Sequence, residues 1–148
     1  MSHIRTTIRA AMKAVLEDAL PSADYDIFAS RKFKVNSTLR ALIDMRFSSE
    51  NISNVTMGTV RTHDASLYIR CQRKADEASL DDLLDADEIA INTAIMSQDW
   101  NPLLMEQPEL VQVNFTEDAT TGNAIASIVL RYDLQYRATN DDLETVRD

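Results

Sequence analysis

Few side chains in this sequence could bind a metal ion or act as nucleophiles. The chain has two histidines, His3 and His63, and one cysteine, Cys71, among 148 residues. Asp64 follows His63 directly, so the two could begin a metal site, but the other histidine is close to the N-terminus. The pair falls between two expected strands, where aspartate commonly hydrogen-bonds its own backbone. The sequence therefore predicts a turn at His63-Asp64 and no bound metal.

Cys71 is the candidate for nucleophilic catalysis, and its surroundings argue against that role. Leu67, Ile69 and Cys71 alternate with polar residues, which predicts a half-buried strand with the thiol on its buried face. A buried thiol is inert, because the reactive species is the thiolate. The two glycines, Gly58 and Gly122, fit neither a nucleophile elbow nor a phosphate-binding loop. We therefore expect no enzymatic activity and no cofactor.

Two charged segments could bind ions or nucleic acid. The acidic run at 81–88 lacks the glycine and the ligand spacing of an EF-hand loop, so it predicts a solvated helix face. The basic loop at 31–34 surrounds Phe33 and could contact phosphate. However, it offers few cations, and the net charge of −9 would repel a polyanion. We expect neither a calcium site nor specific nucleic-acid binding.

The charge is divided unevenly along the chain. Residues 1–74 carry 12 Lys and Arg against 7 Asp and Glu, a net charge of +5, whereas residues 75–148 carry 3 against 17, a net charge of −14. Such asymmetry between halves points to a partner surface rather than to catalysis. Because both halves are expected to share one sheet, part of this asymmetry can cancel within the subunit.

Length and composition fit one ordinary globular domain, with 45% hydrophobic and 26% charged residues. No apolar stretch is long enough to span a bilayer, so we expect no membrane association. No apolar core of signal-peptide length follows the N-terminus, and a single cysteine fits a reducing compartment. We expect a single domain over residues 1–137, then an acidic and flexible tail over 138–148, in a protein that is cytosolic or belongs to a particle assembled in the cytosol.

Hydrophobic periodicity predicts two helices and five strands. One helix is expected over 4–20, with Ser2 as its N-cap and Pro21 as its stop, and the other from an N-cap at Ser79 to just before Asn101. Alternating patterns place strands at 25–29, 39–47, 67–73, 111–116 and 124–136. The last is long enough to bend at a bulge or to project beyond the domain. The order α-β-β-β-α-β-β predicts a single α+β domain, a largely antiparallel or mixed sheet with two helices packed on one face.

This order resembles the tail terminator proteins of long, non-contractile-tailed bacteriophages, the lambda-type family. The resemblance covers roughly residues 1–137. It is carried by the opening helix, the Arg31-Lys32-Phe33 loop, the arginine-rich strand at 67–73, the acidic Ser-Leu-Asp-Asp-Leu-Leu helix opening at Ser79, and the closing hairpin that ends at Tyr136.

The resemblance implies a structural role in the virion, at the head-proximal end of the tail, after assembly in the host cytoplasm. The protein would form a homohexameric ring that caps the tail tube, stops its polymerisation and offers a surface for a head-completion or neck protein. The hairpin at 111–136 could extend its sheet edge to a neighbouring subunit. Exposed charge selects the residues expected to contact another subunit or the tube protein: Arg31, Lys32, Lys34, Asp81, Asp82, Asp85, Glu88, Asp141, Asp142 and Glu144.

Two other functions remain open at the level of sequence. One is another head–tail connector component, with a different number of subunits in its ring. The other is a small ligand-binding α+β domain with an apolar pocket between helix and sheet. The mass of the assembly separates the ligand-binding domain from a ring of six, whereas another connector component would also form a ring.

Overall fold

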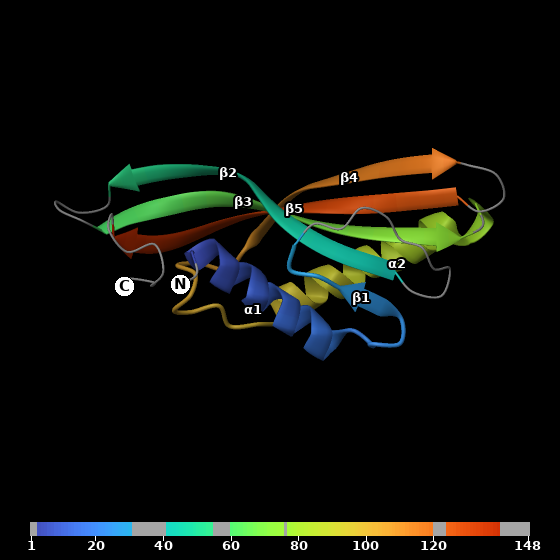
Figure 1. Ribbon diagram of the computed structural model, residues 1–148, viewed down its shortest axis with the longest axis horizontal. Helices are drawn as coiled ribbons and strands as arrows, with labels where there is room; N and C mark the ends of the chain where they lie inside the picture. The colour runs from blue at the N-terminus through green and yellow to red at the C-terminus, as the bar shows by residue number, and fades with distance from the viewer. Residues whose placement is uncertain (1–2, 31–40, 55–59, 76, 120–123, 140–148) are drawn as a thin grey trace.

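The computed structural model describes residues 3–30, 41–54, 60–75, 77–119 and 124–139. Its two helices and five strands occur in the predicted order and form a single α+β domain (Figure 1). The elements are α1 (Ile4–Ala19), β1 (Tyr25–Ile27), β2 (Ala41–Asn54), β3 (Val60–Ala75), α2 (Glu77–Met96), β4 (Glu109–Ala119) and β5 (Ala124–Thr139).

The strands form one mixed sheet in the order β1-β2-β3-β5-β4. Only β1 runs parallel to its neighbour, and it pairs with β2 over Ala41–Ile43 alone. The remaining pairs are antiparallel. In Figure 1 the loop ends of the hairpins β2–β3 and β4–β5 point to opposite ends of an elongated molecule, and both helices lie beneath the same face of the sheet. The predicted fold class is therefore confirmed.

The helix α1 forms because four apolar side chains recur every fourth residue. Ile4, Ile8, Met12 and Leu16 are fully buried, and burying each such side chain contributes about 1.5–3 kcal/mol. The N-cap is His3, not the predicted Ser2, and the Nδ1 atom of His3 accepts a hydrogen bond from the Arg5 amide at 3.0 Å. A histidine nitrogen can replace the usual hydroxyl here because an N-cap needs only an acceptor within reach of the first amides.

The helix α2 begins at Glu77, two residues before Ser79, so Ser79 lies inside the helix and the predicted N-cap was wrong. Sequence patterns place such ends poorly, since a serine suits the first turn as well as the cap. The periodicity of this helix predicts an apolar stripe of Leu80, Leu83, Leu84, Ile91, Ala94 and Ile95. Five of these residues are buried in the core, and Leu83 is half-buried.

Four of the five strands are longer than predicted, whereas β1 ends at Ile27, two residues before the predicted end. β3 extends in both directions beyond the expected 67–73 and places His63 and Asp64 within its ladder, opposite Ile52 and Asn51 of β2. The predicted turn at His63-Asp64 was therefore wrong, because the partners that make a polar dipeptide acceptable inside a strand come from other strands.

The last strand, β5, pairs with β3 in continuous register along its whole length. The bulge considered for this strand is therefore not found there; the register shifts lie in β2, between Phe47 and Ser49, and in β4, between Leu110 and Gln112. β5 ends at Thr139, two residues beyond the boundary expected at 137, and Ala138 is buried. The rest of the expected tail and the turn expected at Gly122 lie outside the described residues.

Candidate functional site

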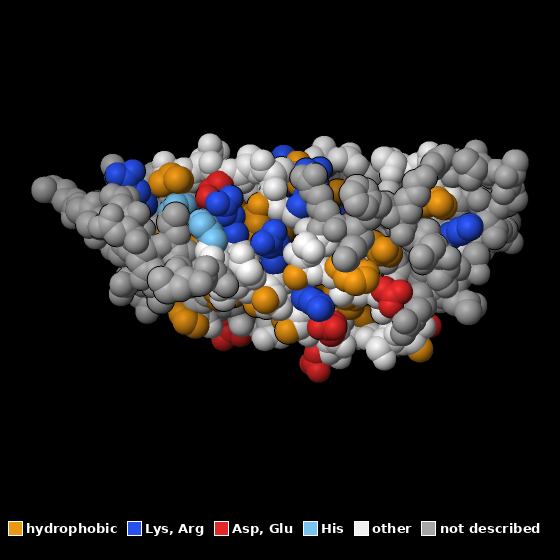
Figure 2. All heavy atoms as spheres, in the orientation of Figure 1, with side chains coloured by type: hydrophobic (Ala, Val, Ile, Leu, Met, Phe, Trp, Pro, Cys, Tyr) orange, Lys and Arg blue, Asp and Glu red, His pale blue; other side chains and the backbone are white. Residues whose placement is uncertain are grey.

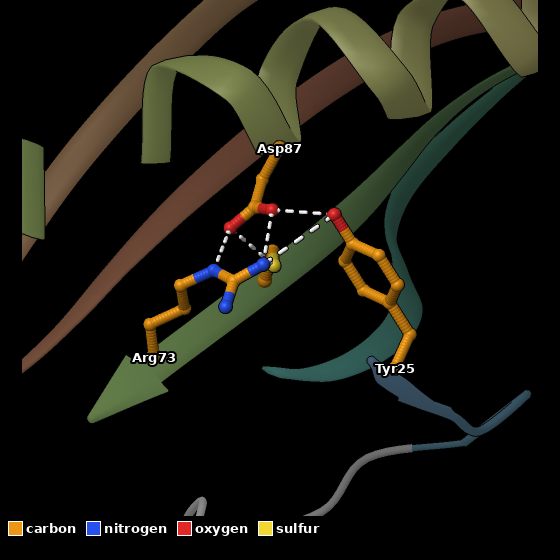
Figure 3. Close-up of polar contacts among 4 residues, drawn as sticks. Tyr25, Arg73 and Asp87 are labelled. Carbon is orange, nitrogen blue, oxygen red and sulfur yellow. Dashed lines mark hydrogen bonds and ion pairs between the residues drawn. The ribbon is translucent and has the colours of Figure 1, made fainter. Parts of the chain in front are cut away.

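The most deeply buried charged group joins three elements under the sheet (Figure 3). Asp87 of α2 is fully buried. Its carboxylate accepts hydrogen bonds from Arg73 of β3, with Nε–Oδ2 at 2.5 Å and Nη2–Oδ1 at 2.7 Å. The Tyr25 hydroxyl of β1 donates to Oδ1 of the same carboxylate at 2.6 Å. We call Tyr25, Arg73 and Asp87 the buried charge cluster.

The opposite charges of Asp87 and Arg73 compensate each other within the buried charge cluster, which also favours the protonated form of the Cys71 thiol. Burial, and then the negative charge of Asp87, raises the pKa of the Cys71 thiol well above its usual value. Burial, followed by the hydrogen bond to Asp87, also raises the pKa of Tyr25. The hydrogen bond to Asp87 raises the pKa of Arg73. The hydrogen bonds of the cluster position α2 against β1 and β3.

A second buried polar group lies toward the other end of the sheet. The Tyr136 hydroxyl donates a hydrogen bond to Glu50, and the Tyr136 ring stacks on His63 at 4.7 Å between centroids. Nδ1 of His63 is 3.6 Å from the Glu50 carboxylate, too far for a hydrogen bond, and has no partner. Across the described ranges, no three histidine, cysteine or carboxylate residues are grouped as a metal site would require.

The face of the sheet opposite the helices carries paired charges. Arg70 donates to Asp44 at 3.0 and 2.5 Å, and Ser66 donates to Asp133 at 3.1 Å. A shallow cavity of about 310 Å³ on this face is lined by carboxylates from three strands and the segment before β4, with one arginine: Asp64, Glu106, Glu109, Arg131 and Asp133.

A cavity of the opposite charge lies between α1 and β2. It measures about 330 Å³ and is lined by His3, Arg5, Thr6 and Arg9 of α1 together with Met45, Arg46 and Phe47 of β2. We call it the arginine cavity. None of its three arginines forms an ion pair with a residue that the structure describes. Burial, and then the charge of Arg5, lowers the pKa of His3. Figure 2 shows Lys and Arg side chains grouped beside histidine on this side of the molecule.

The predicted contact residues divide into described and undescribed groups. Asp81, Asp82 and Asp85 are exposed on the outer face of α2, and Glu88 is half-buried. The structure places these four on one helix, as predicted. Their neighbour Asp87, expected on the same solvated face, is instead fully buried. The other predicted contacts lie outside the described residues: Arg31, Lys32, Lys34, Asp141, Asp142 and Glu144.

Sequence reasoning missed the arginine cavity because it concentrated on the basic loop at 31–34. A signal was present, since Arg5 and Arg9 are four residues apart and therefore lie on one side of a helix. The contribution of Arg46 could not be read from the chain, because it depends on how β2 docks beside α1.

The two outer edges of the sheet complete the candidate surfaces. Beyond Ile43, no described strand pairs with the outer edge of β2, and none pairs with the outer edge of β4 at any point. Each edge carries uncovered apolar side chains. Ile52 of β2 is 54% exposed, and Val111 and Phe115 of β4 are 42% and 60% exposed. Phe115 pairs with the fully buried Ile128, so it faces the helix side of the sheet without being covered by a helix.

No protein-family model matches the sequence, and a search of curated proteins finds no similar chain. Neither helix, within the described residues, is long and apolar enough to cross a membrane. The fold and the chemistry of its surfaces therefore provide the basis for a functional proposal.

Proposed function

We propose that this protein is a structural ring-forming component of a phage tail, a tail terminator that caps the tail tube. The observation that carries the proposal is the pair of unpaired, partly apolar sheet edges on opposite sides of one subunit. Monomeric proteins normally cover or charge such edges, since an exposed edge pairs with other chains. Two different edges that meet head to tail make a heterologous contact, and such a contact closes into a ring when the rotation between subunits allows it.

The exposed side chains make this contact physically specific. Phe115 and Val111 on β4 would cover Ile52 on β2 of the next subunit, while the two backbones extend the sheet across the boundary. Removing an apolar surface from water contributes about 25 cal/mol per Å². The apolar side chains of Val111 and Phe115 would therefore contribute to stability only in the assembly, where they are buried.

The resemblance to lambda-type tail terminators supplies the rest of the proposal. It implies six subunits, a tube protein on one side of the ring and a head-completion or neck protein on the other. This function requires no catalytic residue. The resemblance also places the ring in the virion, at the head-proximal end of the tail.

Native mass spectrometry and negative-stain imaging with tail tubes test the proposal. Six chains of 16.7 kDa give a ring of about 100 kDa, and we expect such rings at one end of each tube. A stable ring of another number would instead support a different connector component. A chain that stays monomeric with tubes and binds a small molecule would support the ligand-binding alternative.

A pair of variants tests the role of the edge. Val111→Lys with Phe115→Lys should abolish rings at the tube end, because lysine blocks pairing at a strand edge. The matched control is Met105→Lys, which changes a side chain that is also partly exposed, at 38%, but lies outside the strands. Rings that survive the double substitution would contradict the proposed edge contact.

A further inference from the structure

We infer that the arginine cavity of each subunit binds the acidic first turns of α2 from a neighbouring copy of this chain. The inference rests on the proposed ring and names the charged contact that sets its register. It identifies both partners by residues, Arg5 and Arg9 on one side and Asp81, Asp82 and Asp85 on the other.

The arginine cavity is built to accept carboxylates. Arg5 and Arg9 extend from successive turns of α1 and line the same cavity, whose β2 side is formed by Met45, Arg46 and Phe47. Guanidinium groups bind carboxylates through two parallel hydrogen bonds, which makes the contact directional as well as electrostatic. The cavity also includes the first turn of α1, where the helix dipole adds positive potential.

In the isolated subunit, the arginines of α1 contact only neutral side chains among the described residues. The first turn of α1 contains no acidic residue that would favour the helix dipole. Arg5 sits there instead, where a cation opposes the dipole. Arg9 likewise forms no ion pair with a residue that the structure describes. A partner carboxylate would turn each of these positions into a favourable one.

The acidic turns of α2 have the matching shape and charge. Asp81 and Asp85 are four residues apart, so they project from one side of the helix with the same spacing as Arg5 and Arg9. Asp82 lies beside them, and all three are exposed without an ion pair to any described residue. A convex helix face fits a concave site, whereas the acidic cavity on the open sheet face is itself hollow and already holds Arg131.

The positions of the two surfaces exclude a contact within one subunit. In Figure 1, α1 begins beneath the left-hand ends of the strands, whereas α2 begins at the right-hand end of the molecule. Each surface also lies beside one of the unpaired edges, because β2 lines the arginine cavity and the β4–β5 hairpin ends near the start of α2. A single head-to-tail contact between neighbouring subunits would therefore bring together the two sheet edges and also the two charged surfaces.

Complementary charge reversals test the inference by native mass spectrometry at low salt. One variant carries Arg5→Glu with Arg9→Glu, and the other carries Asp81→Lys with Asp85→Lys. We expect each variant alone to lose the ring peak that the wild type gives, because every contact then places like charges together. An equimolar mixture should recover the ring with the two variants in equal numbers, since alternating subunits make every contact attractive again.

A third variant keeps the test decisive if one of the others is impaired. The chain with all four substitutions should form a ring by itself, because its cavity and its helix have exchanged charge. Circular dichroism confirms that each variant is folded. A matched control, Glu17→Lys with Asp18→Lys, alters exposed carboxylates at the other end of α1 and should leave the ring intact.

The outcomes separate this inference from the proposed function. Rings from either double variant alone, or no recovery in both the mixture and the four-substitution chain, would overturn the charged contact. A wild-type chain that stays monomeric at its highest soluble concentration would do the same, since direct self-association must increase with concentration. If rings still form at tube ends whatever the charge at these four positions, the proposed terminator function is unaffected. Capture of inorganic phosphate or an oligonucleotide in place of a second copy would assign the cavity to another anion.

Discussion

Arginine has opposite roles in two regions of this molecule. In the buried charge cluster, Arg73 has two hydrogen bonds to Asp87 and a cation–π contact with Tyr25. In the arginine cavity, Arg5 and Arg46 line an open surface with no carboxylate partner among the described residues. The positive charge of the buried charge cluster is thus neutralised within the subunit, whereas the positive charge of the arginine cavity is not neutralised by any described residue.

Burial explains why only one region is neutralised. The Asp87 side chain is 1% exposed and that of Arg73 is 15% exposed, so neither charge could remain unpaired without a large loss of hydration energy. Arg5 and Arg9 remain in contact with water, which solvates an unpaired cation at little cost. Within the buried cluster each charge therefore needs its partner, while the arginines of the cavity can accept a partner from another molecule.

Breaking the buried pair should have the largest effect on stability. Asp87→Ala leaves Arg73 buried without a counter-charge and should lower the free energy of unfolding by about 3–5 kcal/mol. Urea unfolding measures this loss. Asp82→Ala is the matched control on the exposed face of the same helix and should change stability by less than about 0.5 kcal/mol. Equal effects of the two substitutions would mean that the buried position is not special.

Removing a single hydrogen bond from the cluster should have an intermediate effect. Tyr25→Phe keeps the ring against Arg73 but deletes the hydroxyl that donates to Asp87. A hydrogen bond to a charged group contributes about 1.5–3 kcal/mol, and thermal unfolding should show a loss of that size. Tyr68→Phe retains the ring beneath Arg46 and should leave the melting temperature nearly unchanged. An equally large loss from Tyr68→Phe would weaken the contrast between the two regions.

Substitutions in the arginine cavity should leave the monomer almost as stable as before. Arg5→Gln removes a cation that opposes the dipole of α1 and also removes a side-chain contact with His3 at 3.3 Å. These changes offset each other, so chemical denaturation should show a difference below about 0.5 kcal/mol. A destabilisation as large as that of Asp87→Ala would show that the cavity serves folding rather than assembly.

The smallest expected change in stability concerns the thiol beside the buried cluster. Since burial raises the pKa of Cys71, the folded chain keeps this proton at a pH where the unfolded chain, with a pKa near 9.0, releases it. This contribution to stability is present below pH 9 and decreases as the pH rises above it. A thiol-specific reagent should react with Cys71 only after unfolding. Rapid reaction of the native protein would contradict the buried position.

The sequence predicted the elements that depend on local periodicity. Ile4, Ile8, Met12 and Leu16 define α1 without any knowledge of the sheet, and Leu67, Ile69 and Cys71 define the buried face of β3. The order of the elements followed from such patterns, and so did the α+β class.

The sequence could not predict features that depend on distant partners. Asp87 appeared to belong to a solvated acidic face, and only the approach of Arg73 and Tyr25 explains its burial. His63 was assigned to a turn because its stacking partner, Tyr136, lies in another strand. The arginine cavity was missed for the same reason, since Arg46 joins it through tertiary packing.

Thiol cross-linking across the proposed contact tests the account most directly. Thr6→Cys places a thiol in the arginine cavity and Ala86→Cys places one beside the acidic turns of α2, both at exposed positions, while Cys71 stays buried. With both substitutions in one chain, a short bismaleimide reagent should produce a ladder of covalent oligomers that ends at six, and each single substitution should not. A double variant that remains monomeric under conditions where the wild type forms rings would contradict the account.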